Sequence, residues 1–551
     1  MSPNSKVEVK KSSINGAGRG LFACQDFGPG DLVVFLDQPL LAELDTDRME
    51  DTCGWCFQRG ATDPMERMQA ASMGLPNGLI EIKKCTRCRR VGYCSKKCQS
   101  KAWRREHKYE CHILAPSTRP ALPMGVRAVI KLLGRLRGST GDEREQILDI
   151  LNFWPVAGDS NHLEDIRRLD REKFDDFNMF ANAAWTYAGK PSIDGHDAEA
   201  VARDLIFNVM YNSFQIGSPL DAGHYGRGFD LLICSANHSC DPNVVRVCNQ
   251  PSTILRALKP IKKDEEIFMA YTETTNPFWV RQAHVKKAYY FTCQCAKCIR
   301  CPVSPEDTFA KPPQKLSKEY CKVADGLVKR HRADLGKFLA GTDESRAQLR
   351  LAAMQASVFD VSESGYSLEN DLKEALHLCI DSGMWTWARQ PVPELCRRLF
   401  SVYMESSSLY KALKLGLKLL VEIMPNISPQ PFCPERLILT ETLALMSSMI
   451  AGPTHPQAER ELAEYGLEPR VIFWGLMLEL RKHIPQMYGW DSPFGKFVNN
   501  YCEQAKAHEI FSQVEVKKEV VEAWPKLQEF LKNIDILKLC DEREDGDCTL
   551  M

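Results

Sequence analysis

Cysteine spacing constrains the fold of this chain more than any other feature. Of the 22 cysteines in 551 residues, seven lie between Cys53 and Cys111 and four between Cys293 and Cys301. The opening residues MSPNSKVEVKK lack the apolar stretch of a signal peptide, so we expect an intracellular protein whose thiols stay reduced. The clusters therefore indicate metal ligation rather than a disulfide framework.

The first cluster holds eight candidate zinc ligands. They form four pairs, Cys53 and Cys56, Cys85 and Cys88, Cys94 and Cys98, and His107 and Cys111. Eight such ligands make two closed tetrahedral sites, which leave no position for a substrate, so the metal would be structural and would supply folding free energy. We favour an interleaved arrangement, in which the first pair joins the third and the second joins the fourth. Spacing alone also allows a sequential arrangement.

A second cluster needs a ligand from elsewhere in the chain. Cys293, Cys295 and Cys298 lie close together in YYFTCQCAKC, and a tetrahedral zinc site requires a fourth ligand. Cys240, within the run NHSCDPN at 237–243, is the candidate we favour. Cys301 and Cys248 are alternatives on spacing. A third zinc site would thus pin two distant segments together.

Composition places few limits on function. The chain has 71 basic and 72 acidic side chains, so no net field draws it to nucleic acid or membrane. The most apolar late stretch, LILTETLALMSSMIAG, is interrupted and too short to span a bilayer. Basic residues do gather around the first cysteine cluster. They favour neutralisation of zinc-bound thiolates over contact with DNA.

Several sequence blocks resemble known domains. RRVGYCSKKCQSKAWRREHKYEC is similar to the MYND zinc finger. GAGRGLFA at 16–23, NHSCDPN, and EEIFMAY followed by YYFTCQCAKC occur in the order of a SET domain with its cysteine-rich post-SET tail. Over roughly residues 1–300 the chain therefore resembles the SET-and-MYND (SMYD) family of protein lysine methyltransferases. The resemblance implies S-adenosylmethionine as cofactor, three structural zinc ions, and histones or other proteins as substrates. It also implies proline-rich peptides as partners of the finger, with DNA contact less favoured.

The same resemblance assigns roles to single residues. The implied cofactor-binding residues are Arg19, Gly20, Asn212, Asn237, His238 and Phe291. Tyr271 and Tyr289 would be the catalytic residues of a lysine channel, with Phe214 also lining it; Tyr290 is an alternative to Tyr289. Methyl transfer requires a neutral, aligned amine, and aromatic walls favour the neutral form by excluding water. His238 is expected to act through its backbone and packing rather than as a general base.

Some positions depart from the family pattern. Ala17 stands where many relatives have a basic residue, and Cys234, Ser235 and Ala236 precede Asn237 where relatives tend to have serine and larger apolar residues. The alternative function is therefore a MYND adaptor or transcriptional regulator with a weak or inactive SET domain. In addition, 28 residues separate Cys56 from Cys85, so a loop within 57–84 should bulge from the finger.

Beyond residue 301 the sequence becomes helical in pattern. Leucines recur at helical spacing in PELCRRLFSVYM and SLYKALKLGLKLLVEIM. We predict an α+β multidomain protein with a β-rich SET core, a cysteine-rich tail, an all-helical, TPR-like C-terminal domain, and a location in the nucleus, the cytoplasm or both. The expected boundaries are 1–50 for the N-terminal part of the SET domain, 51–115 for the MYND finger, 116–210 for a helical insert, 211–272 for the SET core, 273–301 for the post-SET tail, 302–316 for a linker, 317–540 for the helical domain and 541–551 for an acidic tail.

Overall fold

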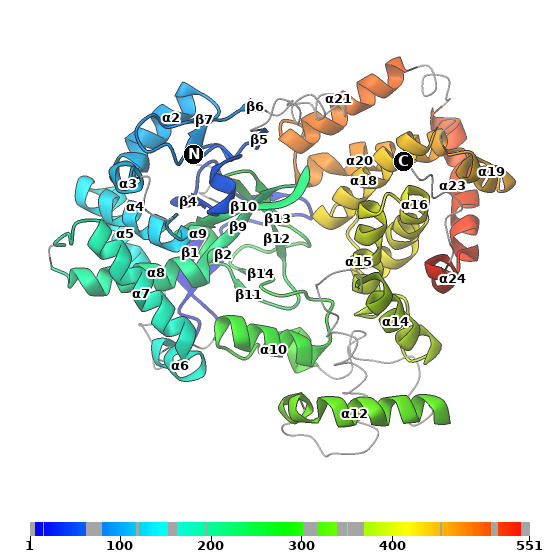
Figure 1. The fold of residues 1–551 in the computed structure, drawn as a ribbon, viewed down its shortest axis with the longest axis horizontal. Helices are drawn as coiled ribbons and strands as arrows, with labels where there is room; N and C mark the ends of the chain where they lie inside the picture. Colours follow the sequence, from blue (N-terminus) through cyan, green and yellow to red (C-terminus); the bar gives the residue numbers. More distant parts are fainter. Residues whose placement is uncertain are drawn as a thin grey trace. The chain divides into compact units, whose positions relative to one another are not determined.

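A computed structural model gives the fold of most of the chain (Figure 1). It describes residues 6–14, 16–61, 80–116, 121–152, 162–193, 195–300, 317–338, 350, 368–451, 455–508 and 516–541. Most of the predicted bulging loop (62–79), Cys301, the predicted linker 302–316 and residues 542–551 of the predicted acidic tail lie outside the described residues. The predicted α+β class and the helical C-terminal region are confirmed.

The chain divides into two compact units. One unit comprises Met1–Thr272, His284–Cys293 and Gln486–Tyr501, and the other comprises Glu273–Ala283, Gln294–Pro485 and Cys502–Met551. The first unit contains every described strand, and the described part of the second is helical. No helix among the described residues combines the length and apolar character that crossing a bilayer would require.

Three small sheets form the β-rich part of the first unit. Their orders are β1-β2-β14-β11, β4-β10-β9 and β12-β13-β3. The strands are β1 Val7–Lys11, β2 Arg19–Ala23, β3 Leu32–Leu36, β4 Leu41–Leu44, β9 Phe214–Ser218, β10 Asp221–Phe229, β11 Asn237–His238, β12 Val244–Asn249, β13 Ser252–Ala257 and β14 Glu266–Met269. Because β14 pairs antiparallel with β2 and parallel with β11, three segments far apart in sequence meet in the first sheet.

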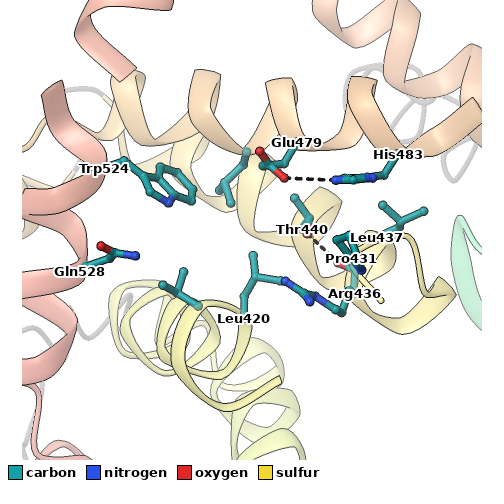
Figure 2. A pocket seen from close by; sticks show the side chains of 11 residues that line it. Leu420, Pro431, Arg436, Leu437, Thr440, Glu479, His483, Trp524 and Gln528 are labelled. Atoms are coloured by element: carbon teal, nitrogen blue, oxygen red, sulfur yellow. Dashed lines mark hydrogen bonds and ion pairs between the residues drawn. The ribbon is translucent and has the colours of Figure 1, made fainter. Parts of the chain in front are cut away.

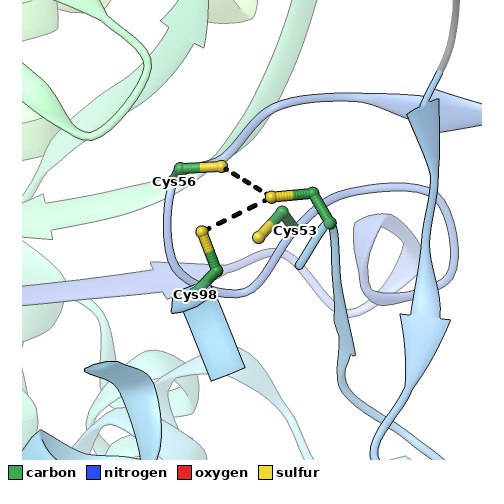
Figure 3. A group of neighbouring side chains, drawn as sticks. Cys53, Cys56 and Cys98 are labelled. Carbon is green, nitrogen blue, oxygen red and sulfur yellow. Dashed lines mark hydrogen bonds between the residues drawn. The ribbon is translucent and has the colours of Figure 1, made fainter. Parts of the chain in front are cut away.

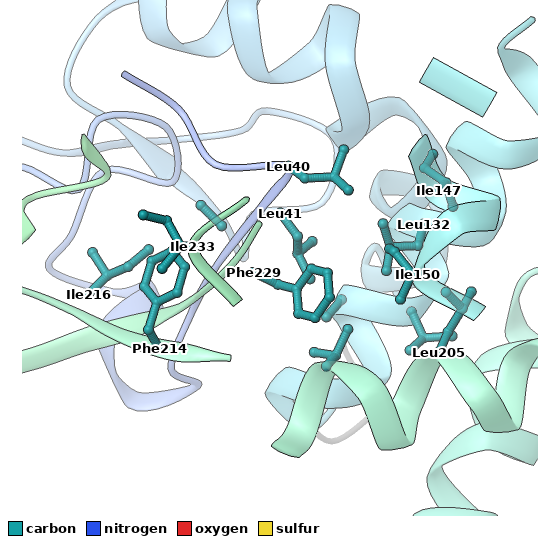
Figure 4. Close-up of a cluster of buried hydrophobic side chains, with 14 of the residues drawn as sticks. Leu40, Leu41, Leu132, Ile147, Ile150, Leu205, Phe214, Ile216, Phe229 and Ile233 are labelled. Carbon is teal, nitrogen blue, oxygen red and sulfur yellow. The ribbon is translucent and has the colours of Figure 1, made fainter. Parts of the chain in front are cut away.

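Helices cover the sheet β4-β10-β9 on one side. Between the finger and β11 the chain forms α4 Met124–Gly138, α5 Asp142–Asp149, α6 His162–Leu169, α7 Arg171–Tyr187, α8 Ala198–Asn212 and α9 Leu231–Cys234. In Figure 4, Leu41 and Phe229 from the sheet face Leu132 of α4 and Leu205 of α8. All four side chains are buried, and burial of each contributes about 1.5–3 kcal/mol relative to exposure. This packing holds helices α4 and α8 against the sheet.

The cysteine-rich finger lies between β4 and α4 in the sequence. Its elements are η1 Asp47–Met49, β5 Gly60–Ala61, β6 Ile80–Glu81, β7 Lys83–Lys84, β8 Gly92–Tyr93, α2 Lys96–Ala102, the π-helical turn η2 Trp103–His107 and α3 Lys108–Leu114. The Ser95 hydroxyl caps α2 by accepting a hydrogen bond from the backbone N–H of Cys98 at 3.2 Å. That cap satisfies one of the free N–H groups at the helix start and sets the orientation of Cys98.

The described chain after residue 272 is helical. Its helices are α10 Phe278–Tyr289, α11 Ala296–Ile299, α12 Lys318–Phe338, α14 Leu368–Asp381, α15 Val392–Glu405, α16 Leu409–Lys418, η5 Leu419–Ile423, α17 Met424–Ile427, α18 Pro434–Ile450, α19 Pro456–Glu464, α20 Pro469–Met487, α21 Pro493–Ala507, α23 Val516–Asn533 and α24 Ile536–Asp541. Helices α14, α15 and α16 pack in sequence order. The two helices predicted from leucine spacing are thus confirmed as α15 and α16.

A cavity of about 230 Å³ lies among the helices of the second unit. Figure 2 shows Arg436 of α18 extending toward it, with Trp524 of α23 on the opposite side. Glu479 and His483 of α20 lie above it, with 3.4 Å between Oε2 and Nε2. Charged and aromatic groups thus share this cavity, which the sequence did not predict.

Glu441 on α18 makes the stability of the protein depend on pH. Burial raises the pKa of Glu441 to about 8 from an ordinary 4.5, and a hydrogen bond with Thr442 opposes this shift only in part. Between pH 4.5 and about pH 8 the folded chain keeps the Glu441 proton that the unfolded chain has released, so rising pH favours unfolding. We expect Glu441→Gln to raise the free energy of unfolding by about 2 kcal/mol at pH 6 and up to about 5 kcal/mol at pH 8.

Thermal melts of the full chain from pH 6 to pH 9 would measure this difference. The Tm of Glu441→Gln should exceed that of the wild type by a margin that widens up to pH 8 and then stays constant. Glu459→Gln on α19, an exposed position, serves as the control. A margin that does not change with pH would contradict the prediction.

Candidate functional site

Glu266 on β14 organises the centre of the first sheet. Its side chain is buried, and its carboxylate accepts hydrogen bonds from the Ser12 hydroxyl at 2.7 Å, the Ser13 backbone N–H at 2.9 Å and the Ser13 hydroxyl. A fourth donor is the side-chain amide of Asn237, at 3.0 Å. An ionised carboxylate accepts but does not donate, so this group suits four converging donors.

Asn237 joins the NHSCDPN run to the first sequence block. Its amide also donates to the backbone carbonyl of Arg19 at 2.8 Å. Gly20 follows directly, and a Cβ added there would lie only 2.4 Å from Oε1 of Glu266. A larger residue at position 20 would therefore displace the carboxylate that holds Asn237.

The backbone before β2 is open on one side. Gly16 and Gly18 adopt φ angles of +80° and +69°, and a Cβ at either would meet nothing within 4 Å. The Arg19 guanidinium turns to Asp149 of α5 and donates two hydrogen bonds, at 2.7 and 2.5 Å. The bond to Arg19 lowers the pKa of Asp149. The contact between Arg19 and Asn237 is made by the backbone carbonyl of Arg19.

His238 lies between the sheet and a group of aromatic rings. Its Nδ1 accepts a hydrogen bond from the backbone N–H of Tyr271 at 3.0 Å, which assigns the proton to Nε2. Nε2 faces the sulfur of Cys240 at 3.3 Å. The imidazole ring centroid is 6.0 Å from that of Phe291. Both imidazole nitrogens of His238 are thus engaged, one by the backbone of Tyr271 and one by the sulfur of Cys240.

Tyr271 and Tyr289 face each other. Their ring centroids are 5.0 Å apart, and the Tyr271 hydroxyl donates to the carbonyl of Ala236 at 2.8 Å. The Tyr289 ring is also 6.5 Å from that of Phe291. Burial raises the pKa of both phenols. Both hydroxyls therefore stay protonated near neutral pH and can donate hydrogen bonds.

Tyr290 makes different contacts from Tyr289. Its hydroxyl lies 3.1 Å from the hydroxyl of Tyr211, and the two ring centroids are 5.7 Å apart. Tyr289, by contrast, contacts Tyr271 and Phe291. Of the two alternatives for the channel residue, this geometry favours Tyr289.

Asn212 and Phe214 lie at the junction of α8 and β9. The Asn212 amide donates to the carbonyl of Asn208 at 3.3 Å, and its own carbonyl accepts from the thiol of Cys234 at 3.0 Å. Phe214 is buried beside Ile216 and Ile233 (Figure 4), with the Arg246 guanidinium 5.1 Å from its ring centroid. These contacts place Phe214 at the edge of the hydrophobic core.

The cysteines of the finger meet in two groups. Cys53, Cys56, Cys94 and Cys98 form one group, part of which Figure 3 shows, and Cys85, Cys88, His107 and Cys111 form the other. Four ligands about 2.3 Å from a tetrahedral zinc lie about 3.8 Å from one another. The measured separations are 3.6 Å for Cys56–Cys94, 3.4 Å for Cys94–Cys98, 3.8 Å for Cys85–Cys111 and 3.7 Å for Cys88–His107. Both groups fit zinc, and their membership is that of the interleaved arrangement.

His107 is oriented for metal binding by a buried carboxylate. Its Nδ1 lies 2.8 Å from Oε1 of Glu110, and Nε2 is directed at the sulfur of Cys88; a neutral imidazole that donates through Nδ1 would offer Nε2 to a metal. Lys131 of α4 lies 3.5 Å from the same Glu110 carboxylate and 2.7 Å from Glu43 of β4. All of these side chains are buried. The finger is thereby tied to α4 and β4 through charges, and loss of one partner in such a buried network typically costs about 3–5 kcal/mol.

The third cysteine group includes the cysteine of NHSCDPN. The sulfur atoms of Cys240 and Cys293 are 4.0 Å apart, and Cys295 and Cys298 complete a set whose ligand atoms all lie within 4.8 Å. These separations are also compatible with tetrahedral zinc. Cys248, one alternative ligand, instead contacts the carbonyl of Gln215 at 2.9 Å.

Sequence reasoning missed several residues that shape this site. Glu266 belongs to the EEIFMAY block, and an acidic residue within an otherwise apolar strand was a readable signal. Asp149 and Tyr211 had no such signal, because their partners Arg19 and Tyr290 are distant in the sequence.

Known proteins resemble this chain over about half of its length. Residues 18–272 match the SET domain family. The chain is 28% identical over 292 residues to histone-lysine N-methyltransferase ASHR1 of Arabidopsis thaliana, covering 52% of this chain and 54% of that protein. It is 28% identical over 295 residues to histone-lysine N-methyltransferase SMYD3 of Homo sapiens, covering 53% and 61%.

A third relative carries both domain names. The chain is 26% identical over 282 residues to the SET domain and MYND-type zinc finger protein 6 of Schizosaccharomyces pombe, covering 51% of this chain and 50% of that protein. The matches thus span between 50% and 61% of the length of these three relatives. The chain thus matches the SET domain over residues 18–272 and, over about half of its length, is similar to SET-and-MYND proteins.

Proposed function

We propose that this protein is an S-adenosylmethionine-dependent protein-lysine N-methyltransferase. The observation that carries the proposal is the cluster of Tyr271, Tyr289, Phe291 and His238 rings beside the amide of Asn237. We assign the cofactor to the residues around Asn237 and the lysine side chain to the two tyrosines. Relatives named as histone-lysine and N-lysine methyltransferases support the same reaction class.

The residues around Asn237 fit the cofactor. S-adenosylmethionine supplies an electrophilic methyl group on a positively charged sulfur. The open backbone at Gly16 and Gly18 would let a ligand approach closely, and Asn237 and Arg19 would contribute polar groups. Phe291 would pack on the adenine, while Asn212 would add a further polar contact near the start of β9.

The two buried tyrosines suit a lysine channel. Free lysine titrates near pH 10.4, and the reaction needs its neutral form. The rings of Tyr271 and Tyr289 would exclude water from the ammonium and so lower its pKa. Their hydroxyl oxygens would accept hydrogen bonds from the amine N–H groups and so direct its lone pair toward the methyl group, with Phe214 closing the channel wall. Alignment of the reacting atoms is a large part of the rate enhancement available to such an enzyme.

The three cysteine groups would each hold one zinc ion with a structural role. Four protein ligands fill each tetrahedral site, so no position is left for a substrate. We propose protein lysines as substrates. Relatives named for histone-lysine methylation make histones the first substrates to test, alongside other proteins.

We predict that Tyr289→Phe lowers turnover without weakening cofactor binding. The substitution keeps the ring and removes the hydroxyl that would orient the amine, so kcat should fall at least about tenfold. Methyl transfer to a mixed pool of cell proteins, with lysine modification read by mass spectrometry, measures kcat. Calorimetry with S-adenosylmethionine measures binding.

Tyr465→Phe on the second unit is the matched control, because it deletes a tyrosine hydroxyl outside the site. Full activity in Tyr289→Phe would contradict the assigned channel. A folded wild type that binds no S-adenosylmethionine and labels no lysine would overturn the proposed methyltransferase function and favour the alternative of a MYND adaptor.

We predict that Glu110→Gln selectively weakens one zinc ion. Gln keeps an acceptor oxygen but not the negative charge, so its hydrogen bond to His107 is weaker, and zinc affinity falls about 10- to 100-fold when such a partner is changed. Mass spectrometry after graded chelator treatment should find three ions in the wild type and early loss of one in the variant. Glu81→Gln, at an exposed position of the finger, should behave as the wild type. Simultaneous loss of all three ions, or no change, would contradict this prediction.

A further inference from the structure

Tyr290 ends helix α10 in a backbone conformation that tyrosine seldom adopts. Its φ angle is +61°, and its N–H donates to the carbonyl of Lys286 at 3.1 Å. Helices commonly end with one left-handed residue, but that residue is usually glycine because a Cβ is strained there. Tyrosine at this position therefore requires compensating contacts from its side chain.

Those contacts come from helices α7 and α8. The Tyr290 hydroxyl lies 3.1 Å from the Tyr211 hydroxyl, and the rings meet edge to face at 76°. Tyr211 is buried, and the ammonium of Lys173 lies 4.6 Å from its ring centroid and 6.0 Å from that of Tyr290. A cation over aromatic faces adds to the attraction. The Tyr211–Tyr290 pair thus anchors the end of α10.

Both partners adjoin residues of the proposed active site. Tyr290 lies between Tyr289, whose ring faces Tyr271, and Phe291, whose ring faces His238. Tyr211 directly precedes Asn212. Any shift of the Tyr290 backbone would therefore move a channel residue and a cofactor residue together.

We propose that Tyr211 and Tyr290 are positioning residues for the reaction. Their hydroxyl contact and ring packing hold the left-handed turn so that Tyr289 and Phe291 face Tyr271 and His238. The pair would act through its neighbours Tyr289, Phe291 and Asn212. The catalytic consequence rests on the proposed methyltransferase function, whereas the anchoring of α10 does not.

The test uses the full-length, zinc-loaded protein. The variants are Tyr211→Phe, Tyr290→Phe, the double variant, and Tyr290→Gly, with Tyr465→Phe as control. Four quantities are measured: kcat, KM for S-adenosylmethionine, Tm, and amide hydrogen exchange over residues 286–291.

Each single Phe variant removes the same hydroxyl contact. We expect each to lower kcat/KM up to about tenfold, because the net free energy of one hydrogen bond corresponds to about that factor in rate. The double variant should be no worse than either single one, because the shared bond can be lost only once. Exchange over 286–291 should become faster, while Tm changes little.

Tyr290→Gly separates positioning from stability. Glycine relieves the left-handed strain, so Tm should stay near the wild-type value. Activity should nevertheless fall further than in the Phe variants, because the ring contact is also lost. A purely structural role would instead lower Tm together with the active fraction and leave kcat per active molecule unchanged.

Two results would overturn the proposal. One is a Tyr290→Gly variant with full activity, and the other is additive losses in the double Phe variant. If the wild type transfers no methyl group, the proposed function fails, yet hydrogen exchange still decides whether the pair anchors α10. Unchanged exchange over 286–291 in Tyr211→Phe would refute that anchoring.

Discussion

The buried carboxylate of Glu266 is the interaction on which the site depends. It gathers donors from Ser12, Ser13 and Asn237, residues up to 254 positions away in the sequence. A buried carboxylate without such donors would cost several kcal/mol, so the donors and the acceptor need one another. Because Asn237 also binds the carbonyl of Arg19, one charge fixes both sequence blocks proposed to bind the cofactor. The aromatic rings are attached to the same sheet, because the backbone N–H of Tyr271, just after β14, donates to His238 on β11.

A second buried network joins the finger to this core. Glu110 orients His107, and Lys131 links Glu110 to Glu43 on β4. Metal binding and packing of the first unit are therefore energetically coupled. Zinc at the second finger group would fix not only the finger but also the position of α4, whose apolar face covers the β4-β10-β9 sheet.

Local sequence patterns predict the class of the protein but not the contacts between residues far apart in the sequence. Cysteine spacing defined the candidate ligands, because coordination needs particular atoms at short intervals. The choice between the interleaved and sequential arrangements required the fold, since both satisfy the spacing. The contact between Tyr211 and Tyr290 spans 79 residues, and no periodicity encodes it. The roles of Tyr271, Tyr289 and the cofactor residues stay predictions, now with a consistent geometry behind them.

The most direct test is a calorimetric titration of S-adenosylmethionine into the wild type and into Glu266→Gln. The amide has nearly the shape of the carboxylate but presents an N–H₂ group to donors, so it cannot hold Ser12, Ser13 and Asn237 together. We predict saturable binding to the wild type and affinity at least about tenfold weaker in the variant, as expected when a buried charged hydrogen bond is lost. Equal affinity in both proteins, or no binding by the wild type, would contradict the account.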